Sequence, residues 1–156
     1  MTCIVCNLGE PKIAYIFSAH THNTSCLISI LIIMTTPKST STSQNKDKTL
    51  ESMRKFAEKY ASRTETYFCS NLSVTAAVIK GLAEHKQELG SPLCPCRHYE
   101  DKEAEVKKAY WNCPCVPMRE EKKCHCMLFL TPDNAFAGNT QSITTEQINE
   151  LCEKMQ

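Results

Sequence analysis

The sequence predicts a mostly helical, small single domain whose reactive residues lie on the loops that connect the helices. Three observations support this fold class. The chain has 156 residues, which is the usual length of one domain. Apolar residues recur at helical spacing in several separate segments after residue 47. No segment alternates apolar and polar residues for long enough to predict a strand.

Residues 1–47 have no periodic pattern, and we expect them to form a disordered extension outside the folded domain. Their apolar run, residues 27–33, is far shorter than the ~20 residues that span a bilayer. A secretory signal would have a cleavage site of small residues after the apolar run, and this sequence has none there. Two interpretations remain: Met34 is the true start, or the segment is an acid-poor, Ser/Thr-rich plastid transit peptide. The predicted folded domain is residues 48–156.

The segment from residue 48 to 90 contains two predicted helices. The first has a charged face opposite an apolar face, and the apolar face consists of Leu50, Met53, Phe56, Ala57 and Tyr60. The charged face consists of Glu51, Arg54, Lys55, Glu58 and Lys59. The second helix is expected to begin after Ser73 as its N-cap and to end at Gly90. Its apolar stripe is Val74, Ala77, Val78 and Leu82.

Two shorter helices complete the predicted domain. A charged helix is expected between Asp101 and Tyr110. A last helix is expected to be capped by Thr145 and to pack through Ile148, Leu151 and Cys152.

The unusual feature of the composition is its cysteine content. A formal charge of +1 gives no global electrostatic attraction to nucleic acid or to an anionic membrane surface, so neither is an expected partner. Eleven cysteines are far more than a domain of this size usually has, and an odd number fits a disulfide framework poorly. We therefore expect metal, cluster or redox chemistry in a reducing compartment.

Six of the cysteines form three Cys-x-Cys units: Cys94-Pro95-Cys96, Cys113-Pro114-Cys115 and Cys124-His125-Cys126. Proline fixes its own φ and favours an extended residue before it, and extended residues at i and i+2 project to the same side. Each of the first two units is therefore expected to present both sulfurs to one centre. A disulfide within such an extended unit would be strained, so the partners should come from other units.

The number of thiols limits the possible types of site but does not select one of them. A cubane cluster takes four thiolates, which leaves two of the six for one redox-active disulfide. A four-cysteine zinc site gives the same arithmetic, although zinc sites favour ligands two to four residues apart. Pure disulfides are the third alternative. Spacing alone does not say which four cysteines would hold a metal.

The segment from Tyr67 to Gly138 resembles the catalytic (beta) chain of ferredoxin–thioredoxin reductase, and the likeness extends more weakly back to Leu50. Three segments carry it: residues 94–99 (CPCRHY), 111–119 (WNCPCVPMR) and 124–129 (CHCMLF). None of the six cysteines departs from the family pattern. Only the first 33 or so residues lack a counterpart in the family's bacterial members.

The resemblance implies two different roles for the six cysteines. Cys94, Cys113, Cys115 and Cys124 would ligate a [4Fe–4S] cluster. Cys96 and Cys126 would form the redox disulfide beside it, with Cys96 as the exposed thiol that attacks thioredoxin and Cys126 as the inner thiol that faces the cluster.

The resemblance also implies the partners and the compartment. The family fold is a helical chain in a thin heterodimer with a small β-barrel variable (alpha) chain. Ferredoxin would be the electron donor and thioredoxin the substrate, in the cytoplasm of a cyanobacterium-like cell or in the chloroplast stroma. A plant-type ferredoxin near −400 mV and a thioredoxin near −270 mV give a driving force of roughly 6 kcal/mol for two electrons.

Several neighbouring residues receive expectations of their own. His125 is interpreted as a proton donor and acceptor for the departing thiolate, because imidazole titrates near neutral pH. His98 is either part of the site or a solvated side chain. Four cations are expected either to steer acidic ferredoxin or to be solvated: Arg97, Arg119, Lys122 and Lys123. Trp111, Phe129 and Leu130 are expected to shield the cluster, and Cys69 and Cys152 to be buried packing residues.

Overall fold

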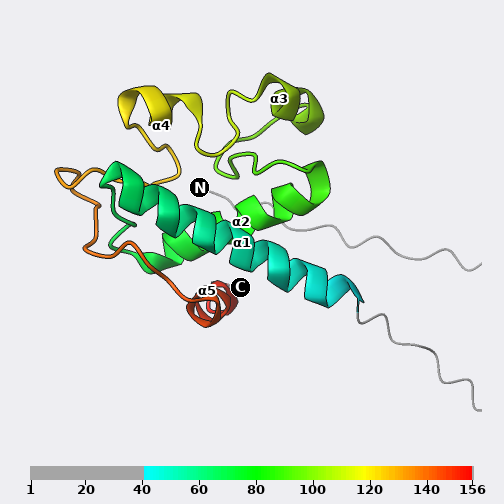
Figure 1. Ribbon diagram of the computed structural model, residues 1–156, viewed down its shortest axis with the longest axis horizontal. Coiled ribbons are helices and arrows are strands. Elements are labelled where there is room, and N and C mark those ends of the chain that lie inside the picture. The colour runs from blue at the N-terminus through cyan, green and yellow to red at the C-terminus, as the bar shows by residue number, and fades with distance from the viewer. Residues whose placement is uncertain (1–40, 156) are drawn as a thin grey trace, which may run out of the picture. The chain divides into compact units, whose positions relative to one another are not determined.

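The structure is a computed structural model that describes residues 41–155, and in this range the chain forms five helices and no strand (Figure 1). The predicted fold class, a small and mostly helical domain, is confirmed for this part of the chain. Three isolated bridges join its loops: Tyr67 with Leu130, Cys69 with Ala137, and Leu93 with Asn112. The expected extension lies, through residue 40, outside the described residues. No helix between residues 41 and 155 is both long enough and apolar enough to cross a membrane.

Helix α1 spans Ser41–Thr64 and therefore begins before the boundary expected at residue 48. Residues 44–48 are exposed, and the first buried side chain is Leu50. Hydrophobic periodicity detects only the part of a helix that packs against something, so the exposed first turns gave no pattern. The predicted apolar face is otherwise confirmed, because Met53 and Ala57 are buried and Phe56 and Tyr60 pack against the core.

The expected charged face of α1 is partly buried rather than solvated. Arg54 donates to both carboxylate oxygens of Glu51, at 2.8 and 2.7 Å, and to the carbonyl oxygen of Ile143 at 3.2 Å. Glu58 pairs with Arg54 at 2.7 Å and accepts from the Ile143 N–H at 3.0 Å. These bonds fasten α1 to the segment that precedes the last helix, an arrangement that helical spacing cannot reveal.

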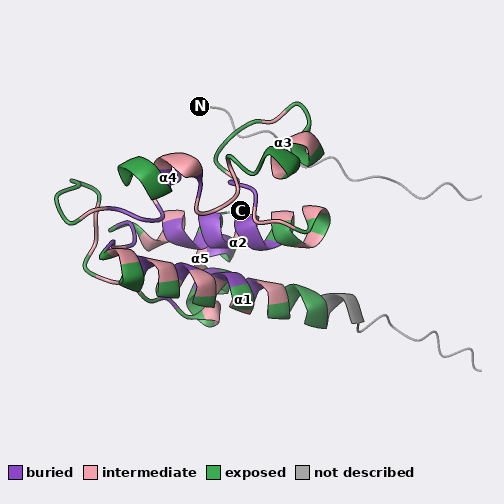
Figure 2. Cartoon of the chain, turned by 45° about the horizontal axis from the view of Figure 1, so that its top comes forward, coloured by how far each residue is buried: buried purple, intermediate pink, exposed green. Residues whose placement is uncertain are grey.

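Helix α2, Leu72–Leu89, is the central helix and packs against both α1 and α5, Thr145–Glu153. Two faces of α2 are therefore covered, and the predicted stripe was partly wrong: Ala77 is exposed, while Ala76 and Ile79 are fully buried. Figure 2 shows the buried surface concentrated on the helices where they face one another.

The helix ends explain two further corrections. Asn71, rather than Ser73, caps α2, and its side chain accepts from the Ser73 N–H. Thr144, rather than Thr145, caps α5 in a reciprocal capping box with Gln147. The predicted end of α2 is confirmed, because Gly90 adopts the left-handed conformation with φ 73°.

Two short helices lie on the other side of the α1–α2 pair from α5 (Figure 1). Helix α3, Lys102–Lys108, is the predicted charged helix; Asp101 caps it, and it ends before Tyr110. Helix α4, Val116–Glu121, was not predicted, since it has only six residues and buries only Met118. The loops that carry the Cys-x-Cys units flank these two helices. Cys69 and Cys152 are buried, as expected.

Candidate metal and redox centre

The loops of the first two Cys-x-Cys units are hydrogen-bonded to each other, and a short helix leads from the second unit to the third. The first two loops pair around the Leu93–Asn112 bridge, where the Cys94 N–H donates to the Trp111 carbonyl at 3.0 Å. The Cys113 N–H donates to the carbonyl of Pro92 at 2.9 Å. Helix α4 then carries the chain from the second unit to the third.

The third unit is a tight turn. The Met127 N–H donates to the Cys124 carbonyl at 3.1 Å, and Met127 itself has φ 55°. Burial falls steeply within this turn, since His125 is exposed and Cys126 is buried. The loop therefore directs one thiol inward and one imidazole outward.

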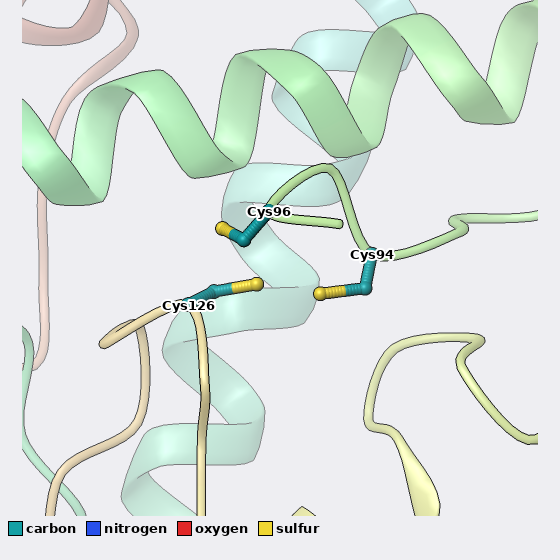
Figure 3. A group of neighbouring side chains, drawn as sticks. All are labelled: Cys94, Cys96 and Cys126. Carbon is teal, nitrogen blue, oxygen red and sulfur yellow. The ribbon is translucent and has the colours of Figure 1, made fainter. Parts of the chain in front are cut away.

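Three sulfurs gather closely in this centre. The Sγ atoms of Cys94, Cys96 and Cys126 all lie within 4.8 Å of one another, with Cys96 exposed and the other two buried. Figure 3 shows Cys94 and Cys96 on one loop and Cys126 on the facing segment, with the sulfurs of Cys94 and Cys126 directed toward each other. The expected convergence within the first unit is present, but a turn at Pro95 and Cys96 produces it rather than the extended backbone that was expected.

A cavity that includes two members of this trio is lined by five thiols. They are Cys94, Cys113, Cys115, Cys124 and Cys126. The remaining lining is largely apolar: Val78, Leu82, Pro114, Met118, His125, Leu128 and Phe129. Cys96 does not line the cavity. The sixth thiol is thus on the solvent side of the centre, and the other five share its interior.

The environment of the cavity disfavours the thiolate form of four of its five thiols, and Cys94 is the exception. Burial raises the pKa of the thiols of Cys113, Cys115 and Cys124. Backbone hydrogen bonding at Phe129 and Leu128 acts the other way on the pKa of Cys124 and lowers it. In the trio, hydrogen bonds from Cys126 and then Cys96 lower the pKa of Cys94. Hydrogen bonds to Cys94 and Cys96 raise the pKa of Cys126.

These properties fit a bound iron–sulfur cluster. Several thiolates in one apolar cavity repel one another unless cations neutralise them, and N–H donors around a sulfur stabilise its anionic form. A single metal ion requires its ligands close together, whereas a cubane takes one thiolate at each of four irons and so accepts more widely spaced sulfurs. In residues 41–155 only the Cys94–Cys96–Cys126 trio has the close spacing that suits a single ion.

A broad cleft borders the cavity on the solvent side, and Cys124 and His125 line both. The cleft also contains Arg97, whose guanidinium lies 3.9 Å from the centroid of the Trp111 ring. Lys122 and Lys123 line it too, and Lys123 pairs with Glu121 at 2.6 Å.

The other residues singled out from the sequence are divided between these surfaces. Phe129 lines the cavity, but Trp111 and Leu130 line the cleft instead. His98 lies in a separate surface hollow, and Arg119 is exposed on α4 outside the cleft.

Sequence reasoning missed two residues that support the centre. Tyr99 donates its hydroxyl to the Cys94 carbonyl at 2.9 Å. His85 on α2 contacts the carbonyl oxygen of Leu93 through Nδ1 at 2.8 Å. Tyr99 lies inside a recognised motif, so its position pointed to it. His85 belongs to no motif, and only the packing of α2 brings it to the loop.

Comparison with known proteins places the chain in a family. A sequence model of the family described as "Ferredoxin thioredoxin reductase catalytic beta chain" matches residues 43–151. The ferredoxin-thioredoxin reductase catalytic chain of the cyanobacterium Synechocystis is 70% identical over 112 residues, covering 72% of this chain and 95% of its own length.

Plant and algal relatives show the same likeness. The chloroplastic catalytic chain of Oryza sativa is 68% identical over 109 residues, which are 70% of this chain and 75% of the relative. The catalytic chain of the alga Pyropia yezoensis is 66% identical over 104 residues, which are 64% of this chain and 90% of the relative. With a family match that includes all six clustered cysteines, this chain belongs to the ferredoxin–thioredoxin reductase catalytic beta chain family.

Proposed function

We propose that this chain is the catalytic subunit of a ferredoxin-dependent thioredoxin reductase. It takes single electrons from reduced ferredoxin and passes them to a disulfide of its own, which then reduces thioredoxin. One observation carries the proposal: five thiols line one apolar cavity, and a sixth thiol stands beside two of them on the solvent side. A metal site for storage or structure has no need of that exposed sixth thiol.

The cysteines divide into four ligands and one redox pair. Cys94, Cys113, Cys115 and Cys124 hold a [4Fe–4S] cluster, which when bound supplies one-electron transfer. All four line the cavity, and this supports the assignment. Cys96 and Cys126 form the redox pair. Their sulfurs lie within 4.8 Å of each other, and Cys126 alone of the two lines the cavity.

Cys96 begins the exchange with thioredoxin because it is the exposed member of the pair. Its thiolate attacks one sulfur of the thioredoxin disulfide; a Cys96–thioredoxin bond forms, and the electron pair of the broken bond leaves with the other thioredoxin sulfur. Cys126 then attacks the Cys96 sulfur. The Cys96–Cys126 bond forms, the Cys96–thioredoxin bond breaks, and its electron pair leaves with the thioredoxin sulfur. Each thioredoxin sulfur takes up a proton, so thioredoxin leaves with two thiols.

The oxidised pair must receive two electrons and two protons before the next cycle. His125 is the proposed proton carrier. It lies between Cys124 and Cys126 in the sequence, it is exposed, and it borders both the cavity and the cleft. A side chain in that position can exchange protons with solvent and with the thiol interior.

The partners follow from the family and from the surface of the cleft. The catalytic name of the relatives implies a second chain, and we expect a one-to-one heterodimer with a variable (alpha) chain. Three cations, Arg97, Lys122 and Lys123, and two acids, Glu121 and Asp133, line the cleft, and the excess of positive charge is suited to acidic ferredoxin. Relatives from a cyanobacterium and from chloroplasts match the compartments expected, the cyanobacterial cytoplasm or the chloroplast stroma.

A zinc site is the competing function, and one observation favours it. The close spacing of Cys94, Cys96 and Cys126 is the spacing that a tetrahedral zinc ion requires of its ligands. That arrangement would occupy both members of the redox pair and leave no thiol to attack thioredoxin.

Metal analysis and two variants distinguish the two functions. The purified chain should be brown and contain about four irons and four sulfides. Cys96→Ser should keep the cluster and lose thioredoxin reduction, whereas Cys113→Ser should lose the cluster. Cys126→Ser should accumulate a mixed disulfide between Cys96 and thioredoxin on a non-reducing gel. Stoichiometric zinc without sulfide would refute the reductase, and bleaching by Cys96→Ser would show that Cys96 is a ligand.

A further inference from the structure

Helix α2 contains a glycine where a glycine is costly. Gly81 lies in the interior of an 18-residue helix, where it is less favourable than alanine by about 1 kcal/mol. Gly81 has an ordinary helical conformation, unlike Gly90, so no special backbone angle requires it. A packing requirement is the remaining physical reason for a glycine at this position.

The neighbour of Gly81 is the loop that carries the redox pair's exposed thiol. A methyl group at residue 81 would lie 2.7 Å from Cβ and 3.0 Å from Cγ of Pro95. Pro95 separates Cys94 from Cys96. Its ring is bonded to the backbone at both ends, so the ring cannot move aside without moving the loop.

His85 holds the same loop one helical turn later on the same face of α2. Its Nδ1 lies 2.8 Å from the Leu93 carbonyl oxygen. Because a carbonyl oxygen can only accept a hydrogen bond, Nδ1 must carry the ring proton. Its Nε2 then accepts from Lys102, at 3.1 Å, at the start of α3. Residues 93 and 95 are thus fixed by two successive contacts from one helix.

We propose that Gly81 and His85 are positioning residues that set the place of Cys96 relative to Cys126. The glycine lets the Pro95 ring lie directly on the α2 backbone, and the imidazole holds the carbonyl of Leu93, two residues before it in the same loop. A disulfide forms only within a narrow range of Cα separations and dihedral angles, so a small displacement of this loop changes its stability. The proposal rests on the proposed redox role of Cys96 and Cys126.

The first test uses Gly81→Ala in the full chain purified with its cluster. The readout is the fraction of Cys96–Cys126 disulfide, measured by mass spectrometry after equilibration with thioredoxin at a series of oxidised-to-reduced ratios. The equilibrium constant for the disulfide should fall about tenfold or more in Gly81→Ala, since the added methyl group displaces Pro95 and a disulfide away from its preferred geometry is more easily reduced. Glu84→Ala, at an exposed position of the same helix, is the matched control and should equal the wild type.

A double variant identifies the contact responsible. In Pro95→Gly the two ring carbons that residue 81 would meet are gone. Adding Gly81→Ala to that background should therefore change the equilibrium constant less than about twofold. An equal effect in both backgrounds, or no effect in either, would overturn the role of Gly81.

Variants of His85 provide an independent test if Gly81→Ala does not fold. His85→Ala removes the donor to Leu93 and should shift the equilibrium in the same direction, whereas His85→Asn keeps a donor near the Nδ1 position and should restore most of it. Equal values for the two variants would refute the positioning role. A wild-type chain that forms no Cys96–Cys126 disulfide would instead refute the proposed function, so the two failures are distinguishable.

Discussion

Phe129→Ala should destabilise the domain and open the cavity at the same time. Phe129 is fully buried, it lines the cavity beside Cys124, and its ring lies 4.6 Å from that of Tyr60 between centroids. Truncating a buried phenylalanine costs about 3–5 kcal/mol, a sum that includes the aromatic pair. At about 4 °C per kcal/mol for a domain of this size, the melting temperature should fall by at least about 12 °C.

The assay compares Phe129→Ala with Phe136→Ala by circular dichroism and by the visible absorption of the cluster. Phe136 is 58% exposed, so its truncation should change stability by less than about 0.5 kcal/mol. The cluster of Phe129→Ala should also bleach faster in air, because water and oxygen gain access to the cavity. Melting temperatures within about 2 °C of each other for the two variants would show that Phe129 does not close the centre.

Three further predictions concern the helices and the extension. Arg54, then Thr145, lower the pKa of Glu51 by hydrogen bonding to its carboxylate. The ionised carboxylate therefore stabilises the folded state fully above the ordinary glutamate pKa, and this contribution is lost as the pH falls below it. Glu51→Gln should flatten the decline in melting temperature between about pH 5 and pH 2. Thr144→Ala removes half of the capping box of α5 and should cost about 0.5–2 kcal/mol in chemical denaturation, and an unchanged midpoint would contradict the cap. A chain starting at Met34 should keep the cluster and the thioredoxin reduction rate of the full chain, and loss of the cluster would show that residues 1–33 take part in the fold.

Local sequence patterns predicted the elements that depend on local physics. The apolar face of α1 and the end of α2 at Gly90 were both predicted, because helical spacing and the left-handed preference of glycine are properties of a few adjacent residues. The caps were misplaced by one or two residues. Asn71 and Thr144 compete with neighbouring polar residues that are equally good caps, and only the backbone geometry selects between them.

The buried face of α2 was misjudged for a different reason. Ala77 and Ile79 are both apolar, and the sequence does not say which side of the helix has neighbours. Because α2 packs between α1 and α5, the side of Ile79 is covered and that of Ala77 is not. The hydrogen bond from Arg54 to the carbonyl oxygen of Ile143 depends in the same way on a segment almost 90 residues away.

The sequence by itself determined the chemistry available to this protein: six thiols in three Cys-x-Cys units, too many for one metal site and arranged as in one family. Only the tertiary structure decided how those thiols are distributed between an apolar interior and the solvent. Cys94 and Cys96 are two residues apart and have the same side chain, yet only Cys94 lines the cavity. The reason is that burial is set by what packs against each residue, and here that is a helix, two other loops and a glycine that lets them approach.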